Sequence, residues 1–300
     1  MGEISQRREV RLKNNWFIEE LKNCKLCPHN CGVNRLRDEK GVCRVGRYAI
    51  ISSYGPHYGE EKVLVGKGGS GTIFFSYCNL KCVFCQNYEI SHLGEGREVK
   101  PEELADIMLY LQNIGCENIN LVSPTHVIAQ IVESIHIAKS KGLKLPIVYN
   151  TGGYDKVETL KKLEGLVDIY MPDIKYGDSQ IAYKYSGIKN YWEVVREAVK
   201  EMHRQVGDLI IKKGIAKKGL LIRHLVLPNR LANSFKVLDF IKNEISEDSY
   251  VNIMPQYYPC WKAFDYPELS RRITYEEYYE VVEYAKKIGL KRGIPLSDSS

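Results

Sequence analysis

From about residue 70 onward, short apolar runs rich in β-branched residues alternate with amphipathic stretches of helical period. This alternation limits the fold, because βαβ units with right-handed crossovers build a parallel sheet. The runs predicted as strands are residues 72–76, 118–123, 145–150, 167–173, 220–227 and 250–254. Six strands are too few for a closed eight-stranded barrel. We therefore predict an α/β fold with a partial (βα)6 TIM-type barrel, and a flat doubly wound sheet is the alternative.

Apolar residues recur every three or four positions between these runs, which predicts helices that pack one face on the sheet. The apolar faces contain Leu104, Ile107, Met108 and Leu111; Ile128, Ile131 and Ile135; Trp192, Val195, Val199 and Met202; Val237, Phe240 and Ile241; Tyr278, Val281, Val282 and Ala285. Residues 1–50 show only a short helical pattern before their cysteines. We expect an N-terminal cysteine-rich metal-binding segment at 1–50 and a barrel core at 51–300.

Composition and charge limit the partners and the location of this chain. Its 43 basic and 37 acidic residues are interleaved, which argues against a nucleic-acid or membrane partner. The first residues lack the apolar stretch of a secretory signal, and no run reaches the roughly 18 apolar residues of a membrane span. We expect a cytoplasmic protein, in which clustered cysteines are metal ligands rather than disulfides. The isolated Cys116 and Cys260 are predicted as small buried apolar residues.

A cysteine triplet directly follows the first predicted strand. Residues 76–87 read SYCNLKCVFCQN and contain Cys78, Cys82 and Cys85. Three thiolates on one loop can hold three corners of a cubane iron–sulfur cluster and leave one iron open to a small molecule. The pattern C-x3-C-x-aromatic-C, with Phe84 as the aromatic, resembles the signature of the radical S-adenosylmethionine superfamily. A zinc site with three cysteines is the alternative.

This resemblance implies both cofactors and a reaction. In the superfamily, the open iron of a 4Fe–4S cluster binds the amino and carboxylate groups of S-adenosylmethionine. An electron from the cluster cleaves a carbon–sulfur bond, and the resulting 5'-deoxyadenosyl radical abstracts a hydrogen atom. The superfamily fold, a partial (βα)6 barrel with the cluster loop after the first strand, agrees with the six predicted strands.

Further residues resemble the pyruvate formate-lyase activating enzyme group. YMPDIKY, residues 170–176, is similar to that group's Asp-x-Lys motif, which implies that Asp173 and Lys175 line the cofactor pocket. The same resemblance assigns Asn150, Thr151, Met171 and Asp173 to a monovalent-cation site beside S-adenosylmethionine. Asn150 stands where that group has an aspartate.

Other strand ends match the superfamily with changes. SPTH, residues 123–126, stands where a Gly-Gly-Glu sequence often grips an amino group, so Thr125 or His126 would bind in its place. Arg223 resembles an arginine near the cofactor carboxylate, although the predicted strand places it at the strand's start. Either Gln256 or Tyr257, in VNIMPQYYP, is expected near the pocket, and His92 near the substrate side.

The likeness to an uncharacterised subgroup of activating-enzyme homologues extends over nearly the whole chain. It includes the stretches ISSYGPHYGEE, GGSGTIFF, PEELADIML and VNIMPQY. It implies a glycine Cα of a glycyl-radical enzyme as the target and a flavodoxin or ferredoxin as the electron donor. A small molecule, RNA or peptide is the alternative target. A non-catalytic scaffold with two zinc sites is the alternative of another class.

A second cysteine group precedes the predicted barrel. Cys24, Cys27, Cys31 and Cys43 form a C-x2-C-x3-C-x11-C pattern, and Gly41 would let the chain turn back. Four thiolates complete a closed site, and both zinc and an iron–sulfur cluster satisfy this ligand set. We favour iron–sulfur, because the cell must load such a cluster into this chain in any case. His29 and His57 are alternative ligands that four cysteines make unnecessary.

Two other patterns carry less weight. GKGGSG, residues 66–71, formally matches the dinucleotide fingerprint, but it leads into a strand rather than opening a helix. We therefore expect a flexible turn or a close backbone approach to the cluster there. Asp155, Glu158, Glu193 and Glu197 fall on polar helix faces and are predicted to be solvated.

Overall fold

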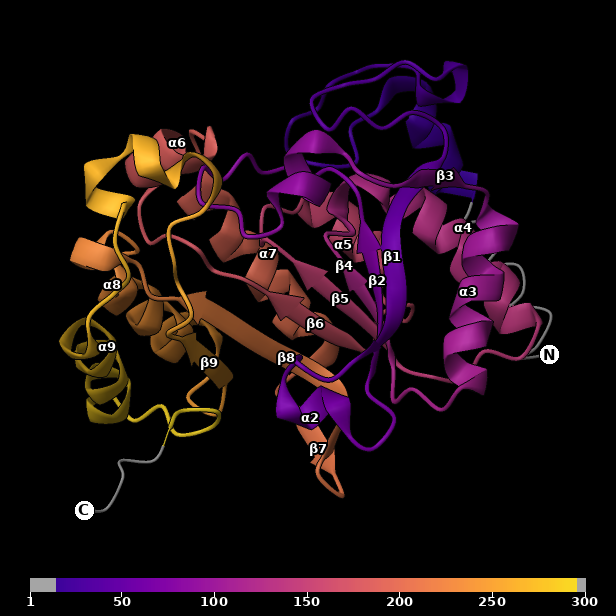
Figure 1. Cartoon of the computed structure of the whole chain (residues 1–300). Helices are drawn as coiled ribbons and strands as arrows, with labels where there is room; N and C mark the ends of the chain where they lie inside the picture. The colour runs from indigo at the N-terminus through magenta and orange to yellow at the C-terminus, as the bar shows by residue number, and fades with distance from the viewer. Residues whose placement is uncertain (1–14, 296–300) are drawn as a thin grey trace.

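The six predicted strands form a continuous parallel array in the computed structural model, which describes residues 15–295. They are β2 (Ser70–Phe75), β4 (Ile119–Val122), β5 (Ile147–Thr151), β6 (Ile169–Pro172), β8 (Ile215–Leu225) and β9 (Tyr250–Met254). Neighbours in this order pair in parallel register. The sheet is curved and stays open, as expected for a partial barrel (Figure 1).

Three antiparallel strands extend this array and were not predicted. They are β1 (Ala49–His57), β3 (Arg97–Val99) and β7 (Ile210–Lys212). β1 pairs with β2, β3 with β1, and β7 with β8. β1 is half exposed and contains Gly55 and Pro56, so its sequence lacks the apolar run of a central strand.

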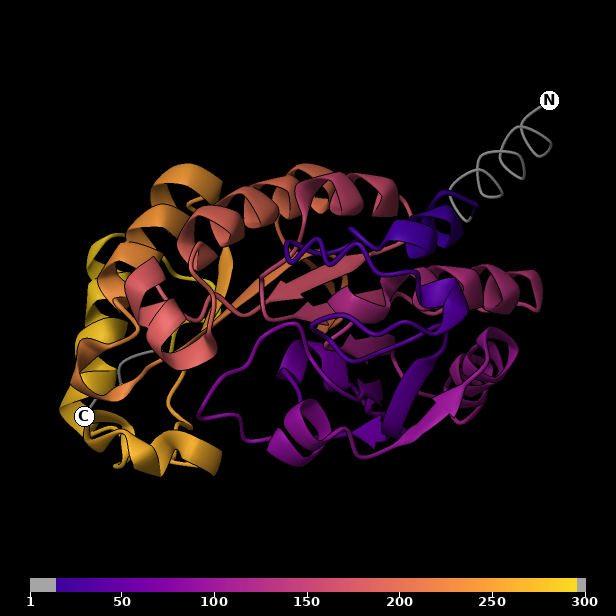
Figure 2. The ribbon, with the colours of Figure 1, turned by 90° about the horizontal axis from the view of Figure 1, so that it is seen from above.

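The amphipathic stretches form helices on the outside of the curved sheet (Figure 2). The longer helices are α3 (Pro101–Asn113), α4 (Ile128–Ser140), α5 (Val157–Leu163), α6 (Ser179–Ser186), α7 (Tyr191–Val206), α8 (Ser234–Phe240) and α9 (Tyr275–Lys287). The short ones are α2 (Lys62–Val65), η1 (Leu21–Asn23), η2 (Arg35–Arg37), η3 (Glu89–Leu93), η4 (Thr125–Val127), η5 (Pro228–Arg230), η6 (Ile241–Ile245), η7 (Trp261–Asp265) and η8 (Pro267–Leu269). Among residues 15–295, no helix combines the length and apolarity needed to cross a membrane.

The N-terminal segment, residues 15–48, packs on the same apolar core as the barrel. Phe17, Leu21, Leu26 and Val45 are fully or almost fully buried and belong to the main core cluster. Figure 1 shows this indigo segment at the end of the sheet opposite α2 and β7. Residues 1–14 of the predicted N-terminal domain lie outside the described part of the chain.

Candidate active site

A cleft of about 700 Å³ opens at the carboxyl ends of the parallel strands. Loops at this edge of a parallel sheet converge, so side chains far apart in the sequence meet there. The cleft brings together many predicted site residues, namely Cys78, Cys82, Phe84, Cys85, Asn150, Asp173, Lys175 and Arg223. His92, Thr151 and Gln256 also line it.

The cluster loop, residues 76–93, is held in place by the end of α6. The backbone N–H groups of Lys81 and Val83 donate to the carbonyls of Ser186 and Tyr185, at 3.3 and 2.8 Å. The Ser186 hydroxyl also donates to the Cys82 sulfur at 3.0 Å. These contacts fix the middle of the loop before any ligand binds.

The other two sulfur atoms of the triplet also have polar neighbours. The Leu80 N–H donates to the Cys78 sulfur at 3.4 Å, and the Cys85 sulfur lies 3.0 Å from the Ser91 hydroxyl. Burial raises the pKa of Cys82 to about 12 and raises that of Cys78. Thiolates at such buried positions need a positive charge beside them, which a metal centre provides.

Aromatic packing supports the chain directly before the third cysteine, Cys85. Phe84 is buried and meets Tyr176 and Tyr257 edge to face, with ring centroids 6.2 and 5.8 Å apart. The His92 ring donates from Nε2 to the Cys82 carbonyl at 3.0 Å. Tyr257, expected near the pocket, is therefore a support behind Phe84, whereas Gln256 lines the cleft itself.

Asp173 sits between two cations. It accepts from Lys175 Nζ at 2.8 Å and from Arg223 Nε at 2.7 Å. Burial alone would raise the pKa of Asp173, but the charges of Arg223 and Lys175 lower it to about 2. β8 begins earlier than predicted and ends at Leu225, so Arg223 lies near its carboxyl end, not at its start.

Glu60 and Glu61 are site residues that sequence reasoning missed. They follow β1 and line the cleft. Glu60 accepts from Arg223 Nη1 at 3.1 Å and from the Asn120 amide at 2.8 Å. Glu61 accepts from the Asn252 amide at 2.7 Å. The sequence signal for these residues was the acidic pair that ends ISSYGPHYGEE. Because β1 was not predicted, the sequence analysis could not place this pair in the barrel.

The residues expected around a monovalent cation are already engaged by protein groups. The Asn150 side-chain oxygen accepts from Arg223 Nη2 at 2.8 Å, and Asp173 accepts from the same guanidinium. The Thr151 hydroxyl donates to Asp155 at 2.6 Å. Arg223 thus binds the side-chain oxygens of Asn150 and Asp173, two of the four residues assigned to the cation.

Asp155 is buried, which contradicts its predicted solvation. It is 2% exposed and accepts from the hydroxyls of Thr151, Thr125 and Tyr149 at 2.6 to 2.8 Å. Asp155 lies in the loop between β5 and α5, after Gly153 with its positive φ, so a helical pattern does not apply there. Thr125 was predicted to bind cofactor. Its hydroxyl donates to Asp155 instead, and Thr125 is not among the cleft-lining residues.

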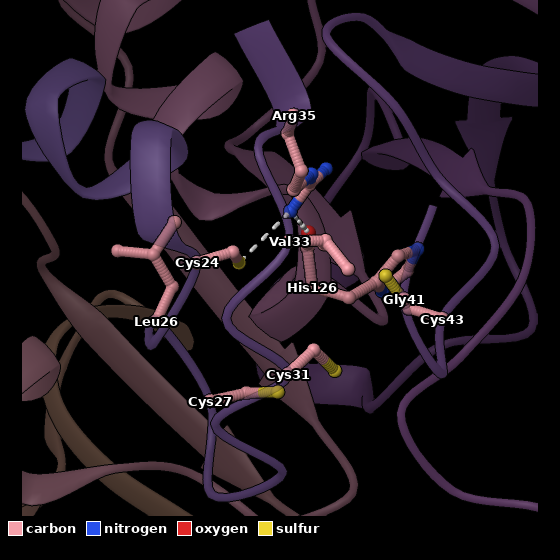
Figure 3. A pocket seen from close by; sticks show the side chains of 9 residues that line it. All are labelled: Cys24, Leu26, Cys27, Cys31, Val33, Arg35, Gly41, Cys43 and His126. Atoms are coloured by element: carbon pink, nitrogen blue, oxygen red, sulfur yellow. Dashed lines mark hydrogen bonds between the residues drawn. The ribbon is translucent and has the colours of Figure 1, made fainter. Parts of the chain in front are cut away.

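The N-terminal cysteines gather in a second place. Cys24, Cys27, Cys31 and Cys43 line a small pocket together with Arg35 and His126 (Figure 3). His126 therefore faces this pocket rather than the cleft, whereas His57 lines the cleft. Within residues 15–295, no three His, Cys, Asp or Glu side chains stand close enough to hold a single ion.

Comparison with known proteins places this geometry in a family. Residues 72–216 match the family described as the Radical SAM superfamily, where SAM is S-adenosylmethionine. The uncharacterized protein MJ0674 of Methanocaldococcus jannaschii is 36% identical over 292 residues, covering 94% of this chain and 78% of the relative. The uncharacterized protein MJ0808 of the same organism is 23% identical over 301 residues, covering 89% and 83%.

Solved structures give weaker matches. Streptococcus suis SuiB bound to the precursor peptide SuiA has a TM-score of 0.49 and 14% identity, over 70% of this chain and 43% of SuiB. The FeFe-hydrogenase maturase HydG from Carboxydothermus hydrogenoformans has a TM-score of 0.49 and 14% identity, over 71% and 49%. This chain thus matches less than half of either protein. On the family match, the chain contains a radical SAM superfamily domain at residues 72–216.

Proposed function

We propose that this radical SAM enzyme removes a hydrogen atom from a glycine Cα of a partner enzyme, as a glycyl-radical activase does. The supporting observation is one cleft that holds both the Cys78–Cys82–Cys85 triplet and the Asp173–Lys175 pair of YMPDIKY. The triplet carries the resemblance to the superfamily, and YMPDIKY carries the resemblance to activating enzymes. A flavodoxin or ferredoxin would supply the electron.

The donor set of the cleft fits the cofactors that superfamily membership implies. The three cysteines would hold a 4Fe–4S cluster, and the polar groups around Arg223 would hold SAM. When bound, these cofactors would supply radical chemistry: one electron from the cluster and, from SAM, a 5'-deoxyadenosyl radical that abstracts a hydrogen atom.

The protein's own residues orient the cofactors and protect the reaction. Asp173 keeps the Arg223 guanidinium and the Lys175 ammonium fixed inside the cleft, where they can meet a carboxylate without reorganising. Phe84, packed between Tyr176 and Tyr257, excludes water behind Cys85. A dry wall limits quenching of a reactive radical by side reactions.

A small cationic molecule is the second candidate target, and the charges deep in the cleft favour it. Three carboxylates, Glu60, Glu61 and Asp173, face two buried cations, Lys175 and Arg223. Burial raises the pKa of Glu61, and Glu61 accepts a hydrogen bond from the neutral Asn252 amide. A substrate ammonium beside Glu61 would complete the charge balance.

Deuterium transfer distinguishes the two targets. The anaerobically reconstituted, reduced enzyme is incubated with SAM and a candidate glycyl-radical enzyme grown on Cα-deuterated glycine. Deuterium in 5'-deoxyadenosine, measured by mass spectrometry, is the expected result. If label instead arrives from a deuterated small amine, and Glu61→Gln removes that transfer while uncoupled SAM cleavage persists, the second target replaces the first. A reduced enzyme that never forms 5'-deoxyadenosine contradicts both.

A further inference from the structure

The four N-terminal cysteines surround a pocket that is separate from the active-site cleft. Cys24, Cys27 and Cys43 are at most 8% exposed, and Cys31 is partly buried. Figure 3 shows their sulfur atoms placed around a hollow, with Arg35 at its edge. A Cβ at Gly41 would lie 2.7 Å from the Cys31 sulfur, so only glycine lets the chain pass this close.

Two of the four sulfur atoms have an N–H donor among residues 15–295. The Val42 N–H donates to the Cys31 sulfur at 3.4 Å, and Arg35 Nη1 donates to the Cys24 sulfur at 3.9 Å. Donors aimed at sulfur stabilise a thiolate over a thiol, so the pocket is arranged for negatively charged ligands.

Arg35 is a buried cation without a carboxylate partner among residues 15–295. It is 1% exposed, and its Nε and Nη1 donate to the carbonyls of Gly46 and His126 at 3.0 and 2.7 Å. Its Nη2 is buried with no hydrogen-bond partner in the described residues. A buried charge without a counter-charge strongly destabilises the folded chain. The neighbourhood therefore requires an anion.

His126 carries a second unsatisfied buried atom beside the same pocket. It is 2% exposed, and Nε2 donates to the Ser76 carbonyl at 2.9 Å, because a carbonyl can only accept. Nδ1 has no partner in the described residues. Two unpartnered polar atoms, on Arg35 and His126, at a pocket lined by four cysteines point to a bound group.

The pocket is directly connected to the cluster loop. His29, between Cys27 and Cys31, donates from Nε2 to the Asn79 carbonyl at 2.7 Å. His126 reaches Ser76 from the other side. Asn79 and Ser76 flank Cys78, so two hydrogen bonds join the second cysteine set to the backbone around the first.

We propose that Cys24, Cys27, Cys31 and Cys43 ligate a second iron–sulfur cluster, with Arg35 as its buried counter-cation. Four thiolates outweigh the positive charge of the metal core, so the centre is an anion of the kind that Arg35 requires. Sulfur atoms arranged around a hollow suit a cubane better than a single ion (Figure 3). The hydrogen bonds to the carbonyls of Asn79 and Ser76, beside Cys78, suit a redox centre, whereas a structural zinc ion carries no electrons.

A variant that lacks the first cluster tests the site in isolation. The full-length Cys78→Ala/Cys82→Ala/Cys85→Ala variant is purified without oxygen, and iron, sulfide and zinc are measured. We expect about four iron and four sulfide ions per chain, and a reduced electron paramagnetic resonance signal that does not respond to SAM. Zinc in place of iron, or a chain without metal, overturns the proposal. The result does not depend on which substrate the enzyme uses.

Arg35 provides an independent readout in the same background. Removing its positive charge in Arg35→Gln should shift the reduction potential of the remaining cluster to a more negative value. Arg35→Lys keeps the charge, so its potential should stay close to that of the parent variant. Arg37, exposed in the same η2 turn, gives the matched control Arg37→Gln, which should leave the potential unchanged. Equal potentials in Arg35→Gln and Arg37→Gln would remove Arg35 from the proposal.

Discussion

Asp173 shows how much one carboxylate organises in this cleft. It is the shared anion of Lys175 and Arg223, with all three side chains at most 19% exposed. Removing the charge leaves Lys175 without its carboxylate and leaves Arg223 with Glu60 alone, and breaking a buried pair costs about 3–5 kcal/mol. Residue-level charge pairing therefore supports both the fold and the site.

The variant Asp173→Asn tests this at the residue scale. We expect the free energy of unfolding to fall by about 3 kcal/mol in anaerobic urea titrations. Asp106→Asn is the control, since its pair with Lys141 is exposed and should cost less than about 1 kcal/mol. Equal losses in the two variants would show that the Asp173 pairs contribute no more than surface ones.

The same carboxylate gives a pH signature. The pKa of Asp173, about 2 in the folded chain, lies below the ordinary value of about 3.9. A carboxyl group with a lowered folded pKa adds stability that is complete above pH ~4 and lost as the pH falls toward 2. The stability gap between the metal-free wild type and Asp173→Asn should therefore narrow from pH 5 to pH 3. A constant gap would contradict the assigned pKa.

At the scale of elements, the turn before β2 depends on the loop before β4. The backbone of Gly69 accepts from the Glu117 N–H at 3.0 Å, and Gly71 N–H donates to the Asn118 carbonyl at 3.1 Å. A Cβ at Gly68 would lie 1.8 Å from the Gly115 carbonyl oxygen. The expected close backbone approach in GKGGSG is thus to this neighbouring loop, not to the cluster.

Gly68→Ala tests that packing. We expect it to destabilise the chain by about 1–3 kcal/mol, because the backbone oxygen cannot move without shifting the loop. Gly55→Ala, in β1, is the control, since no atom lies within 4 Å of its added Cβ. Its stability should change by less than about 1 kcal/mol in the same thermal or urea titration. A tolerated Gly68→Ala would mean that the two loops separate freely.

For the whole molecule, the shared core predicts that the barrel does not fold without the N-terminal segment. Deleting residues 1–48 removes Phe17, Leu21, Leu26 and Val45 from the main core. Each buried side chain of this kind contributes about 1.5–3 kcal/mol, against a net stability of about 5–15 kcal/mol. We expect the truncated chain to lack a cooperative unfolding transition by circular dichroism. Cooperative unfolding with retained SAM binding would instead establish the predicted boundary at residue 50.

The sequence predicted those parts of the molecule that depend on local pattern. Periodicity found all six parallel strands, since burial on both faces of a parallel sheet requires continuous apolar runs, and it found helices α3, α4, α7, α8 and α9 but not α5 and α6. Spacing placed Cys78, Cys82 and Cys85 on one loop after β2, because neighbours along the chain stay neighbours in space. Resemblance added Asp173, Lys175 and Arg223, which the structure brings into the same cleft.

Tertiary structure decided what depends on contacts between distant segments. β1 is a strand because β2 lies beside it, and only that pairing brings Glu60 to Arg223 across 163 positions of the chain. Likewise, the Thr125 hydroxyl donates to Asp155, and His126 faces the N-terminal cysteines rather than the cleft. Hydrogen-bond partners and buried charges are set by three-dimensional proximity, and local sequence carries no signal for atoms that meet only after the sheet has formed.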